Sequence, residues 1–199
     1  MSVLKVILFD LGRVLMHIDF DAFPNGLGLT TQEQRLPYTG LTKKIVRKYE
    51  EGKISTNEFL DAMVPVYNYR FSREQILNAF NDIIVEDNQD IIAFVEEVRA
   101  KYRLGVLSNT CACHWEKVER ISSIIKIFPD LFTSFHLGVM KPDPIIYQRV
   151  CETISVAPDQ VLFIDDLKEN VVGAQTFGMK GIVFQNSEQL KSDFSLRKW

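Results

Sequence analysis

Several features are scarce in this sequence of 199 residues, and each absence excludes a class of protein. No apolar run approaches the roughly 20 residues that a membrane-spanning helix needs, and the N-terminus enters a strand pattern without a signal-peptide cleavage site. Charges of the two signs are interspersed and sum to −3, so we expect no nucleic-acid or membrane partner. The cysteines number only three and lack a disulfide spacing, which predicts free thiols and a cytoplasmic location.

Strand and helix patterns alternate through most of the chain. Hydrophobic residues make up 46% of it, which is enough for a full core at this length. Helical patterns at 90–101 and 169–177 separate the strand patterns, and Gly178 is positioned to cap the second helix. Apolar runs typical of strands buried on both faces occur at 3–9, 104–107, 161–164 and 181–184, with a weaker run at 131–136. This alternation predicts an α/β fold, with a Rossmann-like three-layer parallel sheet.

One segment, residues 18–86, breaks the alternation. It has no convincing buried strand, but a helical pattern at 41–51 ends near Gly52. Two capping-box spacings precede further apolar helical stretches, Ser55 with Glu58 and Ser72 with Gln75. We therefore predict that residues 18–86 form a small helical lobe inserted after the first strand of a core made of residues 1–17 and 87–199.

Polar side chains follow four apolar runs or the turns after them. Ligands of open α/β sheets bind beyond the carboxyl ends of the strands, so these positions are candidates for a site. Taken singly, each of the first three has an ordinary structural explanation: Asp10 as a turn residue, Ser108 with Asn109 as a helix N-cap, and Lys141 as a surface lysine.

The fourth position is the least ordinary of the set. Asp165 and Asp166 close the run at 161–164, and two adjacent carboxylates at the end of a buried strand repel each other unless a cation or hydrogen-bond donors compensate. Carboxylate oxygens are ligands that Mg²⁺ prefers. A further carboxylate from Asp10 would complete a magnesium site.

In this order, the four positions resemble the four motifs of the haloacid dehalogenase (HAD) superfamily: Asp10, Ser108, Lys141 and the pair Asp165–Asp166. The resemblance runs from the N-terminus to about Phe184. Its first motif, Asp-Leu-Gly-x-Val, is similar to that of sugar phosphatases and of epoxide-hydrolase N-terminal domains. The resemblance implies that Asp10 attacks a phosphoryl group and forms an aspartyl-phosphate, which water then hydrolyses.

The resemblance also implies roles for the other motif residues. Mg²⁺ would be held by Asp10, the backbone carbonyl of Gly12, and Asp166, with Asp165 close by or bridging through water. Three side chains would contact the phosphoryl group: Ser108 and Asn109 through its oxygens, and Lys141 by neutralising charge shared with Asp10. The lobe would be a cap that closes over a small phosphorylated metabolite, in a monomer or homodimer.

One position departs from the phosphatase pattern. Phosphatases of the superfamily carry a second Asp two residues after the nucleophile as general acid and base, and here that residue is Gly12. Loss of this group lowers rates typically 10²- to 10⁴-fold, so aryl phosphates should react better than alkyl phosphates. Water or another side chain could replace it, and His17 and Asp19 follow closely.

Two alternatives to a phosphatase stay open. One is a catalytically weak or inactive ligand-binding or interaction protein. The other is a metal-independent dehalogenase, although Asp165 and Asp166 argue against it, because dehalogenases do not keep this pair.

Two further features have weaker functional interpretations. Cys111-Ala112-Cys113-His114 lacks the two-residue gap of most structural zinc sites, which favours a packing role. Arg13, beside Gly12, is placed to reach either substrate or lobe, or to lie on the surface.

Overall fold

The central sheet consists of five parallel strands in the order β5-β4-β1-β6-β7. The computed structural model describes residues 3–197, so the outermost residues of the predicted core, 1–2 and 198–199, lie outside the described range. The strands are β1 (Val6–Phe9), β4 (Arg103–Ser108), β5 (Asp130–Thr133), β6 (Val161–Asp165) and β7 (Lys180–Val183). The predicted α/β fold with a parallel sheet is confirmed.

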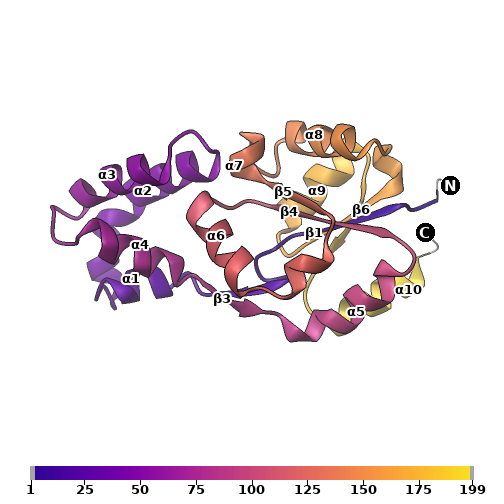
Figure 1. Ribbon diagram of the computed structural model, residues 1–199, viewed down its shortest axis with the longest axis horizontal. Coiled ribbons are helices and arrows are strands. Elements are labelled where there is room, and N and C mark those ends of the chain that lie inside the picture. Colours follow the sequence, from indigo (N-terminus) through magenta and orange to yellow (C-terminus); the bar gives the residue numbers. More distant parts are fainter. Residues whose placement is uncertain (1–2, 198–199) are drawn as a thin grey trace.

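Strand β1 lies in the middle of the sheet and is buried on both faces. Its side chains alternate between two apolar clusters, with Ile7 and Phe9 on one face and Val6 and Leu8 on the other. Helices α8 and α9 cover one face, and α5 and α10 cover the other (Figure 1). The helices of this part are α5 (Gln89–Arg99), α6 (Ala112–Ile121), α7 (Ser134–Leu137), α8 (Pro144–Ile154), α9 (Lys168–Phe177) and α10 (Ser187–Leu196), with 3₁₀ turns at Ile124–Ile127 and Pro158–Gln160.

Four helices form a lobe beyond one end of the sheet (Figure 1): α1 (Ala22–Gly26), α2 (Gln32–Glu50), α3 (Thr56–Val66) and α4 (Arg73–Asn81). The capping boxes predicted at Ser55 and Ser72 are both present and start α3 and α4. Helix α2 begins well before the predicted residue 41, because a third capping box joins Thr31 and Gln34 ahead of a polar first half.

Two predictions about strands were wrong. The lobe is joined to the sheet through an antiparallel pair, β2 (Met16–Ile18) with β3 (Ile84–Asp87), where the sequence showed no convincing strand. These strands have three and four residues, too few for an alternating pattern to stand out. The weak run at 131–136 is a strand only to Thr133, after which the short helix α7 begins and ends at the left-handed Gly138.

All three cysteines are free thiols, as predicted, and they are buried. Among residues 3–197, none of the helices combines the length and apolar character needed to cross a membrane.

Candidate active site

The side chain of Lys141 connects three of the predicted motifs at the carboxyl end of the sheet. Its Nζ atom donates to Asp10 Oδ1 at 2.6 Å, to Asp165 Oδ2 at 2.8 Å and to the Leu107 carbonyl at 2.9 Å. An ammonium has three protons, and these three acceptors use all of them. The lysine is therefore buried in a fixed orientation between two carboxylates from different strand ends.

Asn109 fixes the backbone of Lys141. Its side-chain oxygen accepts from the Lys141 N–H at 2.8 Å, and its side-chain nitrogen donates to the Lys141 carbonyl at 3.0 Å. The amide therefore holds the loop that carries the lysine. Its predicted contact with phosphoryl oxygens stays a prediction.

Asp165 is fully buried, and its carboxylate accepts several hydrogen bonds. Besides Lys141, the donors are the Leu167 N–H at 2.8 Å and the Asn170 side-chain nitrogen at 3.0 and 3.1 Å from the two oxygens. These donors satisfy both oxygens of the buried side chain and fix its orientation. The sequence did not assign Asn170 a role, although an amide one helical turn after a strand-end carboxylate is a usable signal.

The three carboxyl groups of this cluster carry more negative charge than Lys141 compensates. One oxygen each from Asp10, Asp165 and Asp166 lies within 4.8 Å of the others. Burial raises the pKa of Asp10 to about 7, with Asp165 adding to the effect and Lys141 opposing it. Burial and then Asp165 also raise the pKa of Asp166. A hard divalent cation suits this oxygen donor set, because it would supply the missing positive charge.

A cavity of about 350 Å³ opens beside this cluster, between the end of the sheet and the lobe. Ser108, Asn109 and Gly12 line its floor, and its walls are largely apolar: Leu11, Ile18, Phe23, Val46, Phe80 and Ile84. At Gly12, an added Cβ would lie 3.0 Å from the tip of the Ile18 side chain. The space that a side chain at position 12 would use is therefore occupied by Ile18.

The other residues singled out near the first motif lie away from the cluster. His17 is exposed on β2 and pairs with Glu86 of β3, and Asp19 accepts a hydrogen bond from the Asp21 N–H. The Arg13 side chain is exposed. One of its terminal nitrogens lies 3.8 Å from Asp166 Oδ2, and its guanidinium carbon lies 5.2 Å from the centre of the Phe20 ring. Of the three, Arg13 alone contacts a predicted site residue.

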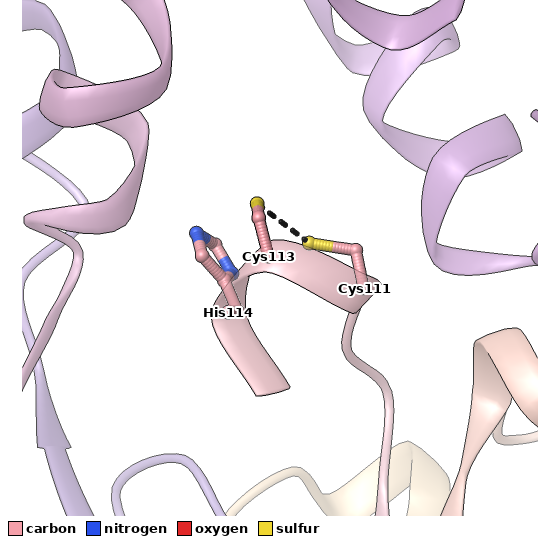
Figure 2. A group of neighbouring side chains, drawn as sticks. All are labelled: Cys111, Cys113 and His114. Carbon is pink, nitrogen blue, oxygen red and sulfur yellow. Dashed lines mark hydrogen bonds between the residues drawn. The ribbon is translucent and has the colours of Figure 1, made fainter. Parts of the chain in front are cut away.

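The side chains of Cys111, Cys113 and His114 gather at the start of α6, with Cys113 between the other two (Figure 2). Their possible ligand atoms lie within 4.8 Å of one another, a spacing that a metal ion can bridge. Each group already has a partner, however. The two sulfurs are 3.8 Å apart and hydrogen-bonded, and His114 Nε2 lies 2.9 Å from the Phe80 carbonyl. These contacts support the predicted packing role.

Comparison with known proteins identifies the family. A sequence model of the haloacid dehalogenase-like hydrolases matches residues 7–184. The chain belongs to this family. This HAD-like hydrolase is 27% identical to D-ribitol-5-phosphate phosphatase of Bacteroides thetaiotaomicron, over 97% of the chain and 98% of that protein. It is 22% identical to (S)-2-haloacid dehalogenase 4A of Burkholderia cepacia, over 90% of the chain and 82% of the relative.

A solved structure extends this comparison. The crystal structure of a HAD family enzyme from Bacteroides thetaiotaomicron, in complex with magnesium and inorganic phosphate, matches the HAD-like hydrolase with a TM-score of 0.82 at 25% identity. The match covers 96% of the chain and 99% of that structure. The two proteins therefore share both the sheet and the lobe.

Proposed function

We propose that this HAD-like hydrolase is a magnesium-dependent phosphomonoester hydrolase acting on a small phosphorylated metabolite. The observation that carries the proposal is the buried Lys141 ammonium, which joins Asp10 to Asp165 beside Ser108 and the cavity. A phosphatase relative over nearly the whole chain and a magnesium and phosphate complex of the same fold support it. The excess negative charge of the three carboxylates favours this function over a metal-independent dehalogenase.

The proposed chemistry assigns a role to each residue of the cluster. Asp10 attacks the phosphorus, the bond to the leaving oxygen breaks, and water hydrolyses the resulting aspartyl-phosphate. Asp10, the Gly12 carbonyl and Asp166 would hold Mg²⁺, which offsets repulsion between the anionic nucleophile and the anionic ester when bound. Asp165 lies close by and orients Lys141.

Two further groups would act on the transferred phosphoryl group. The Ser108 hydroxyl and neighbouring backbone N–H groups donate to its oxygens, and Lys141 balances charge that develops between it and Asp10. In this proposal Asn109 binds phosphate with the remaining amide proton while it holds Lys141.

We further propose that residues 18–86 form the cap of this enzyme. The cavity lies between the lobe and the strand ends, where a phosphate on Ser108 would place the leaving group against the apolar walls. Closure of such a lobe excludes water from the phosphoryl group and selects among leaving groups.

A magnesium-supplemented screen of phosphate esters tests the proposal on three proteins: wild type, Asp10→Asn, and Asp90→Asn as a matched control on the exposed start of α5. Asp10→Asn should reduce turnover by at least about 10³-fold, as for other covalent nucleophiles. Asp90→Asn should be as active as wild type. Full activity in chelator, or in Asp10→Asn, would overturn the proposal. If the protein retains a ligand without turning it over, it is a binding protein. If it releases chloride from a haloacid without added metal, it is a dehalogenase.

A further inference from the structure

The proposed phosphatase needs a group that gives a proton to the leaving oxygen, and Gly12 has none. Four charged or titratable side chains line the cavity beside Gly12: Lys43, Arg47, Glu50 and His114. Arg47 does not release a proton near neutral pH, and Lys43 is an exposed side chain of α2 that solvent surrounds. His114 and Glu50 are the two remaining candidates for the proton donor.

His114 has no proton available for a leaving group. Burial lowers its pKa to about 4, so the ring is neutral at pH 7. A neutral ring has one N–H, and Nε2 must carry it, because its partner at 2.9 Å is the Phe80 carbonyl oxygen, which only accepts. Glu50 is the remaining group.

The backbone around Glu50 is fixed to the loop that follows β4, although Glu50 belongs to a helix of the lobe. The Ser134 hydroxyl donates to the Glu50 carbonyl at 2.6 Å and accepts from the Thr110 N–H at 3.0 Å. The hydroxyl of Tyr49 accepts from the Cys113 N–H at 3.0 Å. Glu50 is thereby anchored to the segment between the end of β4 and the start of α6, which supplies Ser108 and Asn109 to the cavity floor.

The turn after Glu50 is equally restricted. Gly52 has a φ of +65°, and an added Cβ there would lie 2.1 Å from the Phe135 carbonyl oxygen. Only glycine fits this approach of the lobe to α7. The end of α2 is therefore a fixed contact with the core, and the Glu50 side chain starts from a defined position over the cavity.

We propose that Glu50 is the general acid and base of the reaction, in place of the Asp that Gly12 replaces. This inference rests on the proposed phosphatase function. As Asp10 attacks and the bond to the leaving oxygen breaks, the Glu50 carboxyl proton goes to that oxygen and an alcohol leaves. Glu50 then takes a proton from the water that attacks the aspartyl-phosphate, which releases inorganic phosphate and restores both carboxyl groups.

The surroundings of Glu50 suit both halves of this cycle. Burial raises its pKa to about 7, Glu51 adds to the effect, and Arg47 opposes it. Cys111, just before α6, interacts with Glu50, and His114 lines the same cavity; both are uncharged near neutral pH, because burial raises the pKa of the Cys111 thiol and lowers that of His114. A carboxyl group with a pKa near the working pH is present in both forms, which is the condition for an acid that must also act as a base.

Glu50→Gln tests the proposal with two substrates, an n-alkyl phosphate and 4-nitrophenyl phosphate, each with Mg²⁺. For the alkyl ester, kcat should fall by about 10²- to 10⁴-fold, because its leaving group needs the proton. For the aryl ester, Asp10 should still be phosphorylated, giving a rapid burst of one equivalent of nitrophenolate before slow turnover. Wild type should hydrolyse the two esters at similar kcat.

Glu51→Gln is the matched control, since it removes the same charge one residue away. Glu51 does not line the cavity; its side chain pairs with Lys53 and with Arg47, which does line it. Its removal should leave the maximal alkyl-phosphatase rate unchanged. Because Glu51 raises the pKa of Glu50, the limb on which activity falls with rising pH should move to lower pH.

The outcomes separate this inference from the function on which it rests. An inactive wild type, or an active Asp10→Asn, overturns the phosphatase function itself. If wild type is active and Asp10→Asn is not, an unchanged alkyl rate in Glu50→Gln overturns the role of Glu50, as does a change confined to KM. If thermal denaturation shows that Glu50→Gln is not folded, the pH profile of Glu51→Gln is the deciding measurement. The inference is contradicted if its activity falls with rising pH over the same range as that of wild type.

Discussion

The two sides of the site are built on different physics. The polar floor consists of Ser108, Asn109 and Gly12 together with the adjoining cluster of Asp10, Lys141 and Asp165, in which Lys141 binds the two carboxylates at 2.6 and 2.8 Å. The apolar wall opposite, represented by Ile18, Val46 and Phe80, offers no comparable directional contact. Charge-assisted hydrogen bonds fix positions, whereas apolar contact scales with area and tolerates changes of shape. The polar floor therefore fixes the groups that react. The apolar wall discriminates among leaving groups by the apolar area that each of them buries.

This contrast predicts steep effects at the floor and graded effects at the wall. Removing one partner of a buried ion pair leaves a charge without compensation, which is strongly destabilising. A change of leaving group at the wall alters only the apolar area removed from water.

Among the tests of this contrast, Lys141→Met should have the largest effect. It removes the cation between Asp10 and Asp165, and kcat/KM should fall by about 10²- to 10³-fold, the usual loss for one donor that stabilises transition-state charge. Steady-state kinetics checks this against Lys101→Met, which changes an exposed lysine in the turn after α5. If kcat/KM of Lys141→Met fell by less than about tenfold, the buried pairs of Lys141 would contribute no more than an ordinary surface ion pair.

An intermediate effect is expected when the acidic side chain at position 50 of the lobe is removed and one is introduced at position 12. Gly12→Asp placed in the Glu50→Gln protein should recover at least about tenfold in alkyl-phosphate turnover, since it restores an acid near the leaving oxygen. The tip of Ile18, 3.0 Å from the new Cβ, must move, so adding Ile18→Val should increase the recovery.

Gly12→Asn in the same background is the control for this rescue. It has nearly the same volume as Asp but no acidic proton, and it should recover nothing. Equal recovery by Asn and Asp would show that packing against Ile18, and not proton transfer, limits the rate.

The smallest effect is expected along a series of n-alkyl phosphates. Each added methylene should raise kcat/KM by about fourfold until the cavity is filled, corresponding to about 0.8 kcal/mol per buried methylene. D-Ribitol-5-phosphate, the named substrate of a relative, should be poorer than pentyl phosphate, because its hydroxyls would lose water against apolar walls. A flat or falling series would show that the wall does not contact the leaving group.

The sequence and the structure agree on the floor for a physical reason. Buried parallel strands are recognisable as apolar runs, and their carboxyl ends meet at one edge, so Asp10, Ser108 and Asp165 could be placed together from the sequence. The resemblance also implied that Lys141 lies close to Asp10. The individual hydrogen bonds could not be predicted, because which oxygens accept the three Lys141 protons depends on the folded geometry.

The residues of the apolar wall and the proposed proton donor, Glu50, could not be predicted from the sequence. Strands β2 and β3 are too short to show a period, so the path of the chain into the lobe was missed. Glu50 is one of the two acidic residues of the polar helix α2 and is followed directly by Glu51, and its place over the cavity comes from the Ser134 and Tyr49 contacts that fix it. Nothing in the local pattern of α2 distinguishes it from Glu51.

The most direct test of the account is to find the phosphorylated residue. Wild type and Glu50→Gln are mixed with 4-nitrophenyl phosphate and Mg²⁺, quenched in acid within one turnover, digested, and mapped by mass spectrometry. We expect one added phosphoryl group on the peptide containing Asp10, localised to its carboxylate and more abundant in Glu50→Gln. A phosphoryl group on another residue, or turnover with no phosphorylated peptide in either protein, would contradict it.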